Sequence, residues 1–97
     1  MSYLSEFPDY DGDLYCPKGW EDYSWHNDIC PRAMYMIEHE AQTIVFSLWQ
    51  DYVDVNKREY DNSKRYLLQI HVNHILIYHY ETDDLEEAKK LVKGVQL

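Results

Sequence analysis

From residue 33 onward, hydrophobic and polar positions alternate with the period of two that is typical of β-strands. Thr43–Val53 is the clearest case, because alternate positions fall on opposite faces: Ile44, Phe46 and Leu48 on one, and Val45, Ser47, Trp49 and Asp51 on the other. Similar runs predict strands over Ala33–His39, Arg65–Val72 and Ile75–Tyr80. Short connections, including a turn at Glu40–Gln42 and a two-residue turn at Asn73–His74, make neighbouring strands antiparallel.

The period changes to that of a helix after the last predicted strand. We expect a helix within Glu81–Lys93, with residues 83–93 as its body. Asp83 would cap it and Glu86 would complete a capping box. An apolar stripe would face the sheet, formed by Leu85, Ala88, Leu91 and Val92. Gly94 stands where a C-terminal glycine cap belongs.

Residues 1–32 show neither period and predict a long irregular lead segment. Four aromatic side chains are candidates to anchor it: Phe7, Tyr15, Trp20 and Trp25. Residues 54–64 form a polar loop. The pattern as a whole predicts one α+β domain over residues 1–97, with an antiparallel sheet of about four strands in residues 33–80 and one C-terminal helix.

The excess of acidic residues indicates what kind of surface this fold has. The chain has 18 Asp and Glu against 9 Lys and Arg, which gives a net charge of −9, and it also has 10 Tyr and 3 Trp. Disordered acidic segments lack such aromatics, so we expect a folded domain with a negative surface. This surface would repel nucleic acid and membranes and attract basic protein grooves.

The cysteines and the N-terminal residues suggest a reducing compartment. The first residues carry no basic or apolar signal region, and no apolar stretch approaches the roughly 20 residues that span a bilayer. We therefore expect a soluble, intracellular protein. Cys16 and Cys30 are expected to be free thiols, with a bridge between them as the alternative.

Two sets of residues are candidate metal sites, and both depart from the usual patterns. Asp9, Asp11 and Asp13 resemble the start of a calcium loop, but Leu14 and Trp20 stand where that loop requires Gly and Glu. Cys16, Cys30 and His26 are spaced too widely for the usual structural zinc site. We expect no metal and no other cofactor.

The sequence contains no complete catalytic motif. Cys30 lies near His26 and Asp28, but no glycine-rich turn or helix N-terminus accompanies it to make an oxyanion site. There is no phosphate loop and no dinucleotide fingerprint. The expectation is a protein that is not an enzyme.

Three stretches carry a resemblance. They are Gly19–Pro31 (GWEDYSWHNDICP), Leu48–Tyr52 (LWQDY) and Lys57–Glu59 (KRE). With the size and the charge, they make the chain similar to small phage- and prophage-encoded anti-CRISPR proteins of the acidic, type I-F kind. That resemblance implies a bacterial host cytoplasm and a CRISPR surveillance (Cascade-like) complex as partner, whose DNA-binding groove such inhibitors occupy. It supplies no motif from which contact residues could be transferred.

The candidate contact residues therefore come from charge placement. Most lie in the lead segment and the rest beside the first hairpin turn: Asp9, Asp11, Asp13, Glu21, Asp22, Asp28, Glu38 and Glu40, with Tyr10, Tyr15 and Tyr23 adding contact area. In an extended segment, Asp9, Asp11 and Asp13 would form a ladder of charges about 6.6–6.8 Å apart. The alternative function is an acidic phage or bacterial interaction module with another partner.

Overall fold

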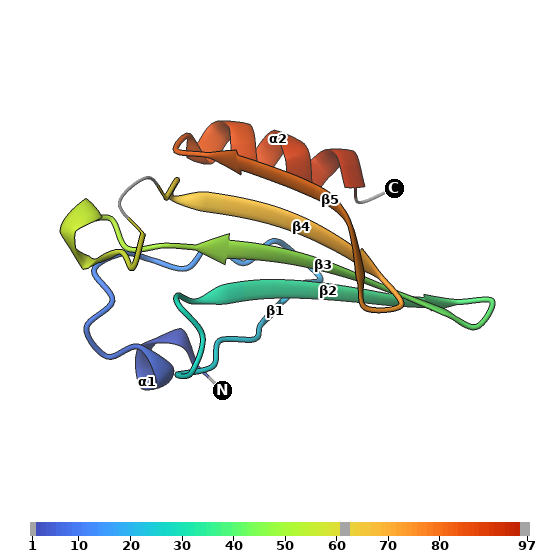
Figure 1. The fold of residues 1–97 in the computed structure, drawn as a ribbon, viewed down its shortest axis with the longest axis horizontal. Helices are drawn as coiled ribbons and strands as arrows, with labels where there is room; N and C mark the ends of the chain where they lie inside the picture. The colour runs from blue at the N-terminus through green and yellow to red at the C-terminus, as the bar shows by residue number, and fades with distance from the viewer. Residues whose placement is uncertain (1, 61–62, 96–97) are drawn as a thin grey trace.

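The fold is an antiparallel sheet with one helix packed against it, which confirms the predicted α+β class (Figure 1). The computed structural model of the chain describes residues 2–60 and 63–95. Its elements are α1 (Tyr3–Glu6), β1 (Glu21–Asp22), β2 (Arg32–His39), β3 (Gln42–Gln50), the short 3-10 helix η1 (Val55–Lys57), β4 (Tyr66–Val72), β5 (Ile75–Thr82) and α2 (Leu85–Val95). The sheet order is β1-β2-β3-β4-β5, a simple meander.

The sheet has five strands where the alternation predicts about four. The additional strand, β1, lies in the segment expected to be irregular and pairs Glu21 with Met34 and Asp22 with Ala33. A two-residue strand has no period, so no pattern could reveal it. The same segment also contains α1, in which the Ser2 side chain accepts a hydrogen bond from the backbone N–H of Leu4.

The elements end a few residues from their predicted bounds. β3 stops at Gln50 instead of Val53, and β5 continues to Thr82 instead of Tyr80. Helix α2 begins at Leu85 because Asp84, rather than Asp83, accepts the hydrogen bond from the Glu86 N–H. The helix also continues through Gly94, which is therefore no C-terminal cap. Asn62 and Asp61, part of the predicted loop, lie outside the described residues.

Both hairpin turns bend through left-handed backbone at non-glycine residues. Glu40 and Ala41 have φ angles of 49° and 64°, and Asn73 and His74 have 49° and 71°. Two consecutive positive φ angles are the geometry of the type I′ turn, whose twist matches that of the strands. His39 pairs with Gln42 across the first turn, which is thus one residue shorter than predicted.

One face of the sheet is covered and holds the main core. Its buried residues come from the lead segment, from strands β2 to β4 and from helix α2: Trp20, Ala33, Phe46, Leu48, Tyr66, Leu68, Ala88 and Val92. The alternation of β3 is confirmed, since Phe46 and Leu48 are both buried here. Helix α2 contributes Ala88 and Val92, each 1% exposed, while Leu85 and Leu91 are partly buried at its sides.

The lead segment crosses this covered face and is held there by Gln50. The Gln50 side chain is fully buried; its Nε2 donates to the Tyr15 carbonyl (2.6 Å) and its Oε1 accepts from the Tyr15 N–H (2.7 Å). One amide thus satisfies both backbone groups of Tyr15, as a neighbouring strand would. Trp20, a few residues later, is placed in the core.

A second, smaller cluster holds the start of the lead segment. Phe7, Tyr10 and Tyr52 are buried together, with Tyr3 packed against them. Phe7, Tyr15 and Trp20 act as the expected anchors. Trp25 does not, because it is 42% exposed and its ring lies tilted against that of its neighbour His26.

Replacing Gln50 tests this anchor. Gln50→Ala would leave the Tyr15 N–H and carbonyl without their partner, and an unsatisfied buried polar group costs about 1–3 kcal/mol. We expect the free energy of unfolding, measured by urea denaturation, to fall by at least this amount. Gln42→Ala, at an exposed position of the same strand, is the matched control. Equal effects of the two substitutions would contradict the anchoring role.

Candidate functional site: the acidic surface and the uncovered sheet face

The aspartates of the lead segment do not form a ladder of free charges. Asp9 Oδ1 accepts a hydrogen bond from the Tyr52 hydroxyl at 3.0 Å. Asp11 accepts two, from the N–H groups of Val53 and Asp54, both at 2.8 Å. Desolvation raises the pKa of Asp11, but these backbone hydrogen bonds outweigh it and hold the pKa below its ordinary value. Asp9 and Asp11 thus tie the lead segment to the chain that follows β3.

The remaining acids of this segment differ in how far they are engaged. Asp22 is half-buried and structural: it accepts hydrogen bonds from the Tyr3 N–H (2.6 Å) and from the Ser24 hydroxyl (2.7 Å). Asp28 is half-buried at the rim of a cavity. Asp13 and Glu21 are exposed. Asp9 and Asp11 are exposed as well, but their carboxylates accept the hydrogen bonds from residues 52–54.

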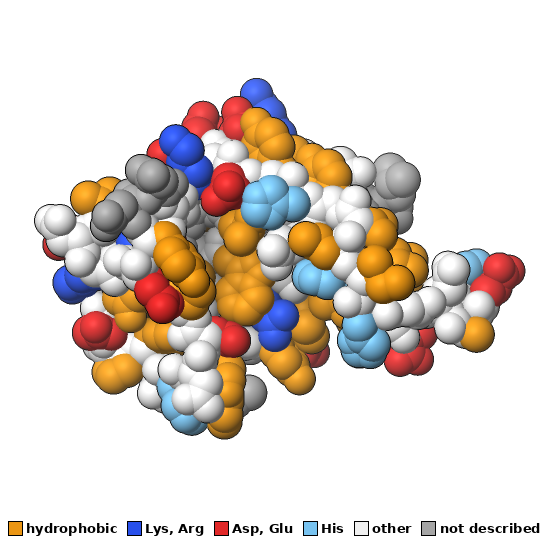
Figure 2. All heavy atoms as spheres, viewed as in Figure 1, with side chains coloured by type: hydrophobic (Ala, Val, Ile, Leu, Met, Phe, Trp, Pro, Cys, Tyr) orange, Lys and Arg blue, Asp and Glu red, His pale blue; other side chains and the backbone are white. Residues whose placement is uncertain are grey.

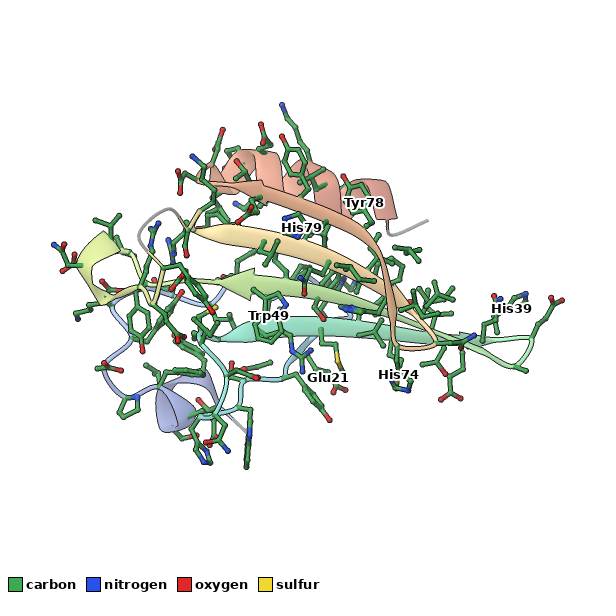
Figure 3. All side chains as sticks on the ribbon, viewed as in Figure 1. Glu21, His39, Trp49, His74, Tyr78 and His79 are labelled. Carbon is green, nitrogen blue, oxygen red and sulfur yellow. The ribbon has the colours of Figure 1, made fainter. Side chains whose placement is uncertain are left out.

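Glu38 and Glu40 are exposed at the other end of the molecule. The domain measures 42 × 26 × 24 Å, and the β2–β3 turn projects at the end of its long axis opposite to α1 (Figure 1). The carboxylate Oε1 of Glu40 lies 3.7 Å from Nε2 of His39, whose side chain is exposed too. Glu38 and Glu40 therefore lie apart from the predicted contact acids of the lead segment, of which Glu21 lies nearer the middle of the long axis (Figure 3).

The three tyrosines predicted as contacts lie at three depths. Tyr10 is buried, and its hydroxyl donates to the Asp51 carbonyl and accepts from Arg65, so it offers no contact surface. Tyr15 is half-buried against the core. Tyr23 is 43% exposed, with the Arg32 guanidinium 5.2 Å from its ring centroid.

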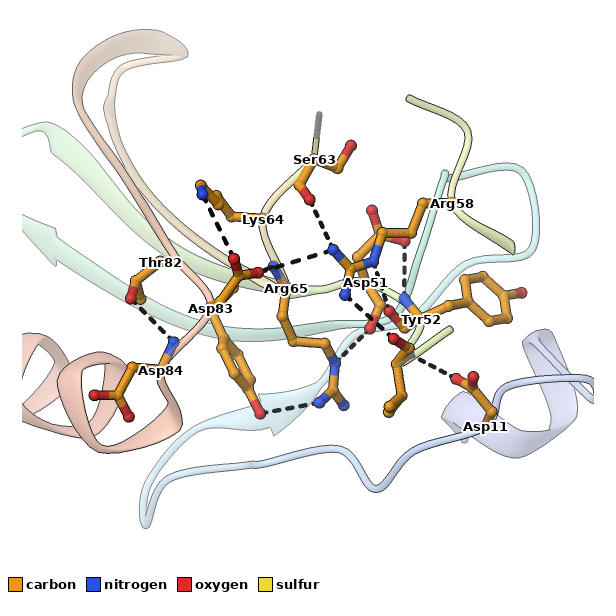
Figure 4. A network of polar contacts seen from close by, with 12 residues as sticks. Asp11, Asp51, Tyr52, Arg58, Ser63, Lys64, Arg65, Thr82, Asp83 and Asp84 are labelled. Carbon is orange, nitrogen blue, oxygen red and sulfur yellow. Dashed lines mark hydrogen bonds and ion pairs between the residues drawn. The ribbon is translucent and has the colours of Figure 1, made fainter. Parts of the chain in front are cut away.

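The arginines are used inside the structure and neutralise few carboxylates (Figure 4). Arg58 donates to the carbonyl oxygens of Tyr52 and Ser63, both at 2.7 Å. Arg65 donates to the Asp51 carbonyl and to the hydroxyls of Tyr10 and Tyr66. Leaving Lys18 aside, the ion pairs of Lys and Arg within the described residues involve two carboxylates, Asp83 and Glu86. Most of the acidic surface therefore keeps its charge.

The other face of the sheet is not covered by α2, and two rows of cross-strand neighbours describe its middle. Arg32, Trp49, Leu67 and Glu81 form one row, and Met34, Ser47, Gln69 and His79 form the next. Figure 2 shows hydrophobic and histidine side chains over the middle of this face, with carboxylates around them.

Trp49 lies near the centre of the uncovered face (Figure 3). The Arg32 guanidinium stacks on its ring at 4.6 Å and lies between it and Tyr23, while the Trp49 Nε1 donates to Gln69. Desolvation lowers the pKa of Arg32. Trp, Tyr and Arg are the residue types that most often dominate binding energy at protein interfaces. This stack is thus suited to a protein contact.

A cavity of about 390 Å³ opens beside Trp49. Its lining includes Cys30, Asp51, Leu67 and Lys64. Burial raises the pKa of the Asp51 carboxyl, and burial raises the pKa of the Cys30 thiol to about 12. Cys30 and Cys16 are free, as expected, but a thiol with this pKa is almost wholly protonated at neutral pH and is a poor nucleophile.

Sequence reasoning missed Arg32, Trp49, Asp51 and Arg65 as surface and cavity residues. A signal existed for two of them, because the alternation of β3 places Trp49 and Asp51 on the face opposite Phe46 and Leu48. No comparable signal existed for Arg65, whose partners are carbonyl and hydroxyl groups brought together by the fold.

Within residues 2–60 and 63–95, no three His, Cys, Asp or Glu side chains gather closely enough to hold a metal ion. No helix of that part of the chain is long and apolar enough to cross a membrane. Comparisons of the chain with protein-family models, with curated proteins and with solved structures find no match.

The structural role of Asp11 predicts a pH-dependent effect. Because its pKa is lowered by folding, its contribution to stability is present above the unfolded-state pKa, near the ordinary 3.8, and is lost as pH falls through the lower folded-state pKa. We expect Asp11→Asn to lower the free energy of unfolding at pH 7, and the difference from wild type to shrink in strongly acidic solution. Urea denaturation over a pH series measures it.

Asp13→Asn is the control for this experiment. Asp13 is exposed, and its substitution changes the net charge by the same amount as Asp11→Asn. A stability gap for Asp11→Asn that persists unchanged at acidic pH would show that the carboxylate charge is not responsible.

Proposed function

We propose that the protein is a non-enzymatic inhibitor that binds a basic nucleic-acid-binding protein complex and blocks its DNA site with an acidic surface. The observation that carries this proposal is the use of the arginines. Arg32, Arg58 and Arg65 are half-buried and spend their donors chiefly on carbonyl oxygens, hydroxyls and aromatic rings. The net charge of −9 is consequently displayed by exposed carboxylates.

Such a surface acts through long-range attraction. Duplex DNA carries about one negative charge per 1.7 Å of its axis, and a groove built to hold it is lined with positive charge. A compact domain with many unpaired carboxylates is attracted to the same groove. Among the predicted contacts, the carboxylates best placed for this role are four exposed ones, Asp13 and Glu21 in the lead segment and Glu38 and Glu40 beside the β2–β3 turn.

The partner suggested by the sequence resemblance is a CRISPR surveillance complex of the Cascade-like, type I-F kind in a bacterial cytoplasm. The support for this identity is the resemblance of the three stretches together with size and charge. Gly19–Pro31 contains β1 and the turn that leads to Arg32, and Leu48–Tyr52 contains Trp49, so two of the stretches meet beside the uncovered face.

The alternative is an acidic interaction module with another partner. Two observations favour it: the exposed acids are spread over several parts of the molecule instead of lying on one face, and an uncovered sheet face carries the Trp49–Arg32–Tyr23 stack. In this alternative, the binding energy comes from the stack and the acids serve solubility and orientation.

A competition experiment tests the inhibitor function. We expect saturating protein to displace labelled duplex DNA from a purified type I-F surveillance complex, and the affinity to fall as salt is raised, since the Debye length is about 8 Å at physiological ionic strength. Combined Glu38→Gln and Glu40→Gln should slow association more than Glu59→Gln with Glu86→Gln, which changes the net charge equally.

DNA binding that is unaffected by saturating protein would reject this inhibitor function. Binding to the complex that is insensitive to salt and to the glutamate substitutions, but lost in Trp49→Ala, would instead support the interaction module.

A further inference from the structure

Strand β5 is an edge of the sheet, and its outer side pairs with no other described strand (Figure 1). Seven of its eight residues are exposed, and Thr82 is the buried one. Tyr80 donates its hydroxyl to Glu87 of α2, so the helix covers the end near Tyr80. The first four residues carry large apolar side chains with exposed fractions of 67%, 48%, 60% and 40%: Ile75, Leu76, Ile77 and Tyr78.

Before Glu81, this edge lacks the charges that usually protect an exposed strand. Natural edges carry charged side chains or proline, or are very short, because their free N–H and C=O groups otherwise pair with another chain. From Tyr66 to Tyr80 the sequence contains no Asp, Glu, Lys, Arg or Pro. The opposite edge differs in both respects, since β1 has two residues and both are acidic.

The strand also contains an irregularity at Ile77. His71 pairs with Leu76 and Ile70 pairs with Tyr78, so Ile77 has no partner in β4. Ile77 is therefore an apolar side chain that belongs neither to the core nor to the paired residues of β4 and β5, so we expect a substitution there to leave the β4–β5 register in place.

We propose that β5 pairs antiparallel with β5 of a second copy of this chain, so that one sheet continues across a two-fold axis. A two-fold contact brings the same surface patch of each copy together. A contact between the acidic surfaces of two −9 chains would set carboxylates against carboxylates, whereas residues 75–80 contain no acid. This absence of charge is the reason that the occupant is a second copy and not a basic partner.

The contact combines two sources of stability. The residues that precede the helix-covered end, 75–79, give about 17 Å of strand at about 3.4 Å each, along which backbone groups can pair. The exposed side chains at Ile75 and Ile77 lose water as the strands approach, which is favourable in proportion to the apolar area buried.

Salt separates this contact from the proposed function. The long-range repulsion between two −9 chains is screened by salt, so self-association should strengthen as salt is raised. Attraction to a basic groove should weaken under the same change. The inference does not depend on the inhibitor function, because its test uses the purified protein alone.

Sedimentation velocity over a concentration series tests the proposal. We expect wild-type protein to shift from monomer to dimer as concentration rises, and to do so at lower concentration in higher salt. Ile77→Lys should stay monomeric, with a folded state confirmed by circular dichroism. Val55→Lys is the matched control. Val55 is 58% exposed on η1, and the substitution adds the same charge away from β5.

Amide hydrogen exchange locates the contact. The β5 amides that do not pair with β4 should become protected as dimer forms, and Ile75→Lys should abolish both dimer and protection if Ile77→Lys is poorly folded. Wild-type protein that remains monomeric at every concentration and salt would overturn the proposal, as would Val55→Lys losing the dimer equally. If β5 instead pairs with a strand of another protein, the purified wild-type protein remains monomeric, which is the first of these outcomes.

Discussion

The buried amide of Gln50 is the contact on which the arrangement of this domain depends. It pairs with both backbone groups of Tyr15 and so fixes where the lead segment crosses the sheet. That position brings Trp20 over Phe46 and Tyr35, where the rings pack together in the core. Without a partner for Tyr15, this polar backbone could not lie buried, and the sheet would keep an apolar face exposed.

The second constraint is the unequal placement of the two kinds of charge. Guanidinium groups have several donors in a fixed plane, so one arginine can hold several carbonyl oxygens of a loop at once. Arg58 does this with the carbonyls of Tyr52 and Ser63. Arg65 holds one carbonyl, that of Asp51, together with the hydroxyls of Tyr10 and Tyr66. The loops gain order, while the carboxylates outside keep their charge. An acidic surface is thus a consequence of how the basic residues are used, as well as of their small number.

The two faces and the two edges of the sheet give the molecule several kinds of surface. One face is closed by α2 and the lead segment, and the other presents Trp49 with Arg32 and Tyr23. One edge ends in the short acidic β1, and the other in β5, whose first six residues carry no Asp, Glu, Lys or Arg. These surfaces differ in charge and polarity, so the proposed contacts with a basic complex and with a second copy use different parts of the molecule and respond oppositely to salt.

The sequence by itself determined the α+β class, the main strands, the helix and the buried face of β3, because each depends on local periodicity that one hydrophobic core enforces. Only the tertiary structure decided the role of each polar residue. Asp11 and Asp13 look alike in the sequence, yet Asp11 binds backbone N–H groups of residues 53 and 54 while Asp13 faces solvent. Gln50, Arg65 and β1 also depend on partners distant in the chain, and hydrogen bonds between such partners leave no period in the sequence.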